Sequence, residues 1–143
     1  MKKTLISLLA TLALPALAQM TPAGVWRSID DGTGEAKAEI SIKDNGKGGL
    51  NGVVARSLIS SSKEPNCSLC TDDRKDKPKV GMEIIRDAVK ASGEEVWEGG
   101  TILDPENGKV YKLRLVPVEG GKRLQVRGYI GPFYRTQTWQ RVQ

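Results

Sequence analysis

The two cysteines are the residues of this 143-residue sequence whose type and spacing most directly suggest chemistry. Cys67 and Cys70 are three positions apart, a spacing that suits a disulfide, a thiol redox pair or half of a zinc site. A zinc site would need Asp72 or Asp73 as further ligands, because the sequence has no histidine and no third cysteine. A redox pair normally opens a helix in a strand-helix-strand unit, and the sequence around the pair has no such pattern. We therefore expect a local disulfide, with redox activity as the alternative and no bound metal or cofactor.

The absence of histidine narrows the possible activities. It excludes Ser-His and Cys-His nucleophile pairs, imidazole-ligated zinc and the usual general base near neutral pH. No other catalytic arrangement is apparent, so we do not expect an enzyme. The chain has 22 Lys and Arg against 17 Asp and Glu. This excess is too small to predict nucleic acid as a partner.

The first 18 residues have the pattern of a cleaved signal peptide. Lys2 and Lys3 precede an apolar run that ends at Leu14, and the small-residue triplet 16–18 follows. The run is too short to span a bilayer, and no cysteine follows the cleavage site for a lipid anchor. We expect a mature chain of residues 19–143, exported to a bacterial periplasm without a membrane span.

After this leader, short runs of alternating apolar and polar residues are separated by clusters of Gly, Asn, Asp and Pro. This pattern is typical of antiparallel strands joined by tight turns. It predicts eight strands, at residues 25–29, 36–43, 50–58, 82–90, 95–103, 109–118, 123–130 and 133–142.

Each predicted strand has one apolar face, as in Tyr111, Leu113 and Leu115. One buried face on each of about eight consecutive strands, without intervening helices, favours a single antiparallel up-and-down β-barrel, because closure removes exposed edges. Residues 60–81 are too polar and too long for a hairpin turn. We expect an ordered excursion or a lid there.

An eight-stranded barrel has an interior that is either filled by side chains or wide enough for one small ligand. Trp97, Tyr111 and Tyr129 lie on three consecutive predicted strands and are candidates to line a pocket. Arg127 and Arg135 are candidates to pair with an acidic ligand group. The alternative is that the aromatic residues are core and the arginines are solvated.

Several segments resemble a bacterial family of small exported proteins known as domain of unknown function 2147. They include Val25-Trp26, Cys67-Ser68-Leu69-Cys70, Trp97-Glu98-Gly99-Gly100-Thr101, Arg127-Gly128-Tyr129-Ile130-Gly131 and Arg135-Thr136-Gln137-Thr138-Trp139. The resemblance implies a lipocalin-like barrel. Gly24-Val25-Trp26 is similar to the Gly-x-Trp of the first lipocalin strand, and Arg141 is similar to the basic residue that packs over that tryptophan. The resemblance thus assigns barrel closure to Gly24, Trp26, Trp139 and Arg141.

Three functions are compatible with these observations. The first is binding or carrying a small apolar or amphipathic ligand, which the barrel and the lack of catalytic groups favour. The second is thiol redox chemistry at Cys67 and Cys70. The third is a structural or interaction module of the envelope with a filled barrel. The identity of a ligand and the oligomeric state are not predicted.

Overall fold

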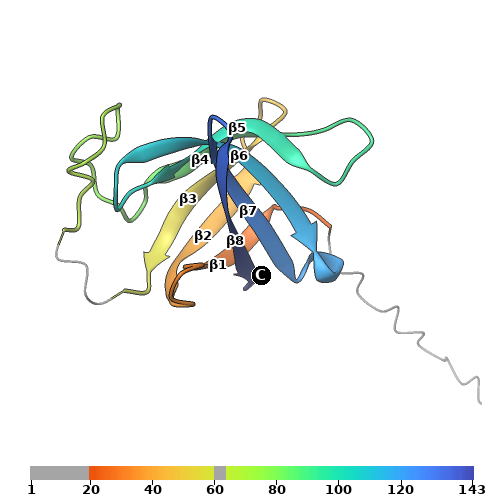
Figure 1. Cartoon of the computed structure of the whole chain (residues 1–143), viewed down its shortest axis with the longest axis horizontal. Helices are drawn as coiled ribbons and strands as arrows, with labels where there is room; N and C mark the ends of the chain where they lie inside the picture. Colours follow the sequence, from red (N-terminus) through yellow and green to blue (C-terminus); the bar gives the residue numbers. More distant parts are fainter. Residues whose placement is uncertain (1–19, 60–63) are drawn as a thin grey trace, which may run out of the picture.

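The computed structural model describes residues 20–59 and 64–143, and the expected signal peptide lies outside these residues. These described residues form an all-β fold with eight strands and one short 3₁₀ helix, η1 (Figure 1). The elements are β1 (Gly24–Ile29), β2 (Ala36–Asp44), β3 (Leu50–Ser57), β4 (Glu83–Lys90), β5 (Trp97–Asp104), β6 (Lys109–Val118), η1 (Glu119–Gly121), β7 (Arg123–Ile130) and β8 (Phe133–Arg141).

The strands form a closed barrel in which each strand pairs antiparallel with the next and β8 returns to β1. This confirms the predicted up-and-down barrel. The register of β7 and β8 extends over eight residue pairs, from Arg123–Gln140 to Ile130–Phe133. The register of β1 and β8 covers Trp26–Arg141 and Arg27–Gln140. The seam of the barrel is therefore short and lies close to the C-terminus.

The inner face of the barrel is apolar because side chains alternate along each strand. Leu113 and Leu115 on β6 and Leu124 and Val126 on β7 are all buried. Gly52 shows how tightly this interior is packed, because an added Cβ would lie 3.0 Å from Ile85. The other buried strand residues with inward side chains include Trp26, Ile40, Ile42, Leu50, Val54 and Trp139.

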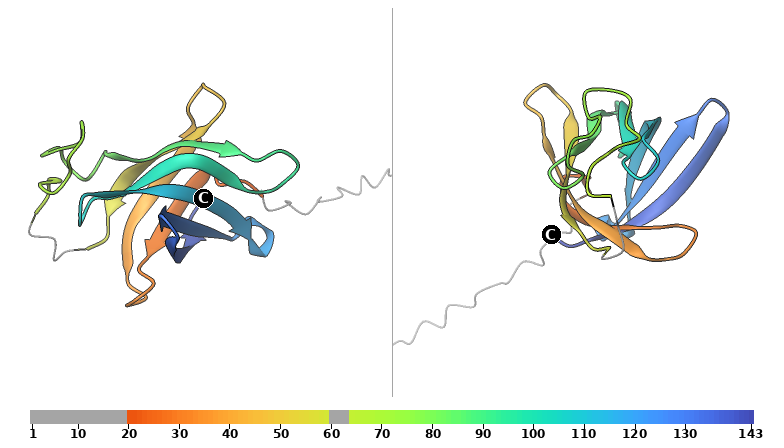
Figure 2. Two further views of the ribbon diagram at one scale, coloured as in Figure 1. Left: turned by 45° about the horizontal axis from the view of Figure 1, so that its top comes forward. Right: turned by 90° about the vertical axis from the view of Figure 1, so that its left-hand side faces the viewer.

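The two ends of the barrel differ. One end holds residues 20–23, the C-terminus and η1, and we call it the closed end. The opposite end holds the connections 30–35, 104–109 and 131–132, and we call it the mouth. The right view of Figure 2 looks at the barrel from the side of the long connection between β3 and β4. The tip of the β7–β8 hairpin projects from the barrel in that view.

The connection between β3 and β4 is described at residues 58–59 and 64–82, and residues 64–82 are an ordered excursion that packs beside the barrel (Figure 1). Asn66 forms a bridge with Pro78, and Cys67 and Cys70 form the expected disulfide. Lys79 pairs with Glu106 in the β5–β6 turn at 3.1 Å. This excursion accounts for the burial of outward-facing apolar residues on β4 and β5, namely Ile84 and Leu103.

Among the described residues, no helix has the length and apolarity needed to cross a bilayer.

Candidate functional site

The strand register determines which aromatic candidates share the barrel interior. Trp97 pairs with Leu115, and Tyr111 pairs with Ile102. Trp97 and Tyr111 therefore both belong to the inner face of the barrel. Trp97 is nearly buried at 8% exposure, towards the closed end, whereas Tyr111 is half-buried next to the mouth. Four residues of strand separate Tyr111 from Leu115, which is about 13 Å. The two aromatic side chains therefore belong to different levels of the interior.

Tyr129 and Arg127 lie on the outer face of the barrel. Their neighbour Val126 is buried inside, and alternation turns residues 127 and 129 outwards. Tyr129 pairs with Tyr134 on β8, with ring centres 5.8 Å apart, and Arg127 pairs with Thr136. The expected convergence of three aromatic side chains in one internal volume does not hold for Tyr129. The positions on consecutive strands were recognised from sequence, but the parity of residue 129 within β7 places it outside.

The four predicted closing residues meet at the closed end. The Arg141 guanidinium lies 4.2 Å from the centre of the Trp26 ring. It also donates hydrogen bonds to the carbonyls of Thr21, Ala23 and Gly121, and burial lowers its pKa. Trp139 pairs with Leu124 one level further into the barrel and is 3% exposed.

Gly24 fits the same end for a steric reason. Its φ is 137°, a value that residues with a side chain rarely adopt, and an added Cβ would collide with the carbonyl of Gln143 and with Arg141. These contacts pack the start of β1 against Arg141 and the C-terminus at this end of the barrel.

At the mouth, apolar residues of the inner face are unusually exposed to solvent. Ile130 and Phe133 pair with each other at the tip of the β7–β8 hairpin, on the inner face, and are 51% and 77% exposed. Tyr111 packs against Gly128, where an added Cβ would lie 3.1 Å from the tyrosine Cβ. The Tyr111 hydroxyl accepts a hydrogen bond from the Asn107 amide in the β5–β6 turn at 3.2 Å. Apolar inner-face side chains thus adjoin polar groups at the mouth, and we call the group formed by Tyr111, Ile130 and Phe133 the cup.

A charged pair bridges the mouth across the seam of the barrel. Arg135 of β8 donates from Nε to both carboxylate oxygens of Asp31, at 2.6 and 2.7 Å, and Asp31 lies in the β1–β2 turn. Its hydrogen bond lowers the pKa of Asp31 and raises that of Arg135. Asp30 adds a longer contact to Arg135 at 3.8 Å. Arg135 was a candidate to pair with an acidic group of a ligand, whereas in the structure it pairs with Asp31 of the protein itself.

The interior below the cup is filled. Ile40, Leu113, Leu115, Leu124 and Val126 are all less than 5% exposed. A long acyl chain could therefore not extend along the barrel axis.

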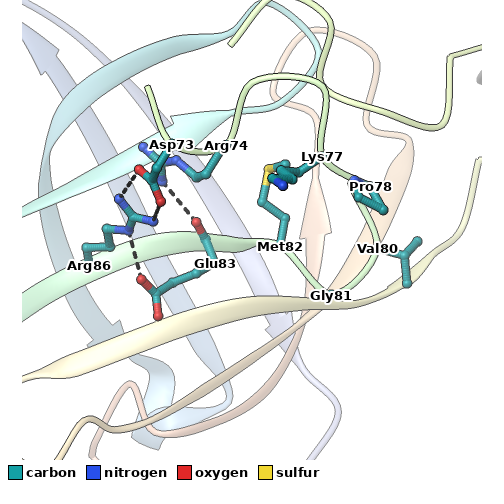
Figure 3. Close-up of a pocket in the computed structure, with 9 residues that line it drawn as sticks. All are labelled: Asp73, Arg74, Lys77, Pro78, Val80, Gly81, Met82, Glu83 and Arg86. Atoms are coloured by element: carbon teal, nitrogen blue, oxygen red, sulfur yellow. Dashed lines mark hydrogen bonds and ion pairs between the residues drawn. The ribbon is translucent and has the colours of Figure 1, made fainter. Parts of the chain in front are cut away.

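A depression beside the excursion is held together by ion pairs (Figure 3). Arg86 binds Asp73 at 2.9 Å and Glu83 at 2.8 Å. Arg74 is buried, donates to the Glu83 carbonyl at 2.9 Å and lowers the pKa of Asp72 to about 2 through a hydrogen bond. The charges of Asp73, Arg74, Glu83 and Arg86 are thus paired within the protein, and we interpret the depression as the anchor of the excursion.

The cysteine pair belongs to the same anchor. Cys67 and Cys70 are 0% and 1% exposed, so a thiolate in solution has no direct path to either sulfur. Within residues 20–59 and 64–143, no group of three or more His, Cys, Asp or Glu side chains is arranged to hold a metal ion.

Sequence reasoning did not pair Asp31 with Arg135, and it placed Tyr129 in the interior. The correct side of Tyr129 could have been found from sequence, because residue 129 alternates with the apolar residues Leu124, Val126 and Gly128. The pairing could not, since it joins a turn and a strand from opposite ends of the chain.

Comparison with known proteins supports the fold. No curated protein matches the sequence. Among solved structures, the chain is similar to protein HP1028 of Helicobacter pylori, which is described as belonging to the lipocalin family. The TM-score is 0.70 and the identity 17%, over 85% of this chain and 82% of that one. Residues 24–141 match the family described as "Uncharacterized protein conserved in bacteria (DUF2147)". With this match over nearly the whole barrel, the chain belongs to the DUF2147 family.

Proposed function

We propose that the protein is an exported, periplasmic binding protein that holds the apolar part of a small amphipathic ligand at the mouth of its barrel. One observation carries this proposal: Ile130 and Phe133 belong to the inner face yet are exposed to solvent. Exposed apolar side chains that adjoin polar groups are typical of binding sites. No catalytic step is part of the proposed role.

The shape of the cup sets the size of the ligand. Because the interior below it is filled, the ligand is a short or compact apolar group with its polar end near Arg135 and Asp31. Burial of ~300 Å² of apolar surface would supply about 7 kcal/mol before the costs of association. We therefore expect affinities in the micromolar range or weaker.

The other two functions receive less support. A thiol redox role conflicts with the burial of both cysteines. A barrel without any ligand remains the competing hypothesis, because its lower part is filled, and the experiment below decides between the two.

The test uses Phe133→Trp as a fluorescent reporter of the cup. The three natural tryptophans are nearly buried and form a constant background. Monomeric octyl glucoside, a neutral amphiphile, is the probe, and we expect a saturable blue shift of the reporter. Val89→Trp is the matched control, because Val89 is 48% exposed on the outer face of β4. No saturable change in the Phe133 reporter, or an equal change in the control, would contradict ligand binding at the mouth.

A pair of tyrosine variants distinguishes the two faces of the barrel. Tyr111→Ala removes an inner wall of the cup, and we expect octyl glucoside binding to weaken several-fold. Tyr129→Ala removes an outward side chain and should leave this binding unchanged. The opposite pattern would place the ligand outside the barrel.

A further inference from the structure

The outer face of β6, β7 and β8 carries a basic and aromatic surface that the proposed ligand site does not use. We call it the basic face, and it consists of Lys112, Arg114, Arg127, Tyr129 and Tyr134. The register places Arg114 directly across from Arg127, and Lys112 directly across from Tyr129. The neighbours Leu113 and Val126 point into the core, so these cations and rings share the outer side.

Arg127 is fixed within this face by uncharged groups. Its guanidinium carbon lies 4.4 Å from the Tyr134 ring centre and 5.9 Å from that of Tyr129. Its Nε donates to the Thr136 hydroxyl at 2.9 Å, and Nη1 donates to the Tyr129 hydroxyl at 3.5 Å. The rings and hydroxyl groups hold the cation in place but do not neutralise it.

The cations of the basic face have no carboxylate partner in the described part of the chain. No Asp or Glu oxygen there lies within 4 Å of Lys112, Arg114 or Arg127. Glu98 on β5 lies across from Arg114 on β6, but the two side chains do not come within 4 Å of each other to form an ion pair. Like charges directly opposite each other on neighbouring strands are unfavourable. A bound anion would relieve this repulsion.

The hairpin that carries Arg127 ends in an apolar tip. Ile130 and Phe133 are exposed there, and Tyr134, which begins the outer face of β8, is 61% exposed. In the right view of Figure 2 this tip projects away from the rest of the barrel. A free phosphate ion would need the arginines but no apolar neighbours. The combination of cations, tyrosine rings and an apolar tip is instead that of proteins that bind at the surface of a lipid bilayer.

We propose that the β7–β8 hairpin and the basic face dock on an anionic lipid bilayer. Lys112, Arg114 and Arg127 contact headgroup phosphates, Tyr134 lies at the level of the headgroups, and the tip inserts at the boundary of the acyl chains. The docking is peripheral and reversible. The two proposals share the exposed tip residues Ile130 and Phe133, but the cations of the basic face do not belong to the proposed ligand site because they face away from the barrel interior.

The test is sedimentation of the folded protein with vesicles of phosphatidylglycerol and phosphatidylcholine in equal parts, and with vesicles of phosphatidylcholine alone. We expect binding to the mixed vesicles, much weaker binding to the neutral ones, and a decrease with added salt. Each cation near the surface contributes about fivefold in affinity. Arg114→Gln and Arg127→Gln should therefore each weaken binding about fivefold.

The matched control is Lys47→Gln, which removes one exposed cation in the turn between β2 and β3, at the other end of the barrel. It should leave vesicle binding nearly unchanged. An equal loss in Lys47→Gln and Arg127→Gln would show that net charge alone attracts the protein, and it would overturn the proposal. Equal binding to neutral and anionic vesicles, or no binding to either, would overturn it as well.

Two further measurements separate the alternatives. If millimolar inorganic phosphate abolishes vesicle binding at constant ionic strength, the site takes free phosphate rather than a lipid surface. Octyl glucoside binding by the double variant Arg114→Gln/Arg127→Gln should equal that of the wild type. Vesicle binding and octyl glucoside binding can therefore be tested, and refuted, independently of each other.

Discussion

The guanidinium of Arg141 stacks on the ring of Trp26 and, through its hydrogen bonds, connects the N-terminal segment, η1 and β8. One side chain thus links the residues before β1 and the last strand to the connection between β6 and β7. Trp26 Nε1 donates a further hydrogen bond to the Pro22 carbonyl at 2.7 Å. The closed end is therefore held by directional polar contacts above an apolar interior.

We predict that Arg141→Ala lowers the free energy of unfolding by about 3 kcal/mol, because it removes charged hydrogen bonds and a cation–π contact together. Urea denaturation followed by circular dichroism measures the change. Arg56→Ala is the control. Arg56 pairs with Glu39 at 2.6 Å on the surface, and an exposed ion pair of this kind contributes less than about 1 kcal/mol. Equal losses in the two variants would show that Arg141 does not organise the closed end.

The disulfide should stabilise the excursion rather than the barrel. We expect the double variant Cys67→Ser/Cys70→Ser to cost about 1–3 kcal/mol, because a short loop gains little from closure. The β-sheet circular dichroism should persist, while trypsin should cut more rapidly after Lys75 and Lys79. Loss of the barrel signal in this variant would refute the assignment of the disulfide to the excursion alone.

Alanine substitutions at two glycines with the same φ test how firmly the excursion packs on the β5–β6 turn. Gly108 and Gly93 both have a φ of 73°, so alanine is strained at either position by about 1 kcal/mol. At Gly108 the added Cβ would also collide with the backbone of Leu69, whereas at Gly93 no atom lies within 4 Å. We predict that Gly108→Ala costs about 1–3 kcal/mol more than Gly93→Ala. Equal costs by thermal denaturation would mean that the excursion is not packed on the β5–β6 turn.

The Asp72–Arg74 pair predicts a loss of stability in acid. The Arg74 hydrogen bond lowers the pKa of Asp72 from 3.8 to about 2 in the folded protein. The folded state therefore binds fewer protons than the unfolded state between these values, and the stabilisation, complete above about pH 4, disappears as the pH falls through 2. Asp72→Asn should show a smaller decrease of unfolding free energy between pH 4 and pH 2 than the wild type. Identical pH profiles would disprove this contribution.

The strand pattern was readable from sequence because each strand buries one face, and alternation together with glycine-rich turns marks both its position and its ends. Arg141 over Trp26 was found through a family resemblance. The prediction that Tyr129 lines the interior used only the fact that Trp97, Tyr111 and Tyr129 lie on consecutive strands. It ignored that residue 129 is an odd number of positions from Val126 and therefore points to the opposite face. The Arg135–Asp31 pair depends on how far β1 and β8 separate towards the mouth, and no local pattern encodes that distance.

The short register between β1 and β8 has a consequence for how the barrel folds. Every other strand pair joins neighbours in sequence, so each forms by closing a connection of limited length, whereas the seam has to bring together the first and last strands. That step carries the largest loop-closure entropy and should come late in folding. Until β8 is in place, β1 and β7 both expose unpaired backbone edges. A chain that ends before Phe133 should therefore be prone to aggregate, even though seven of its eight strands are intact.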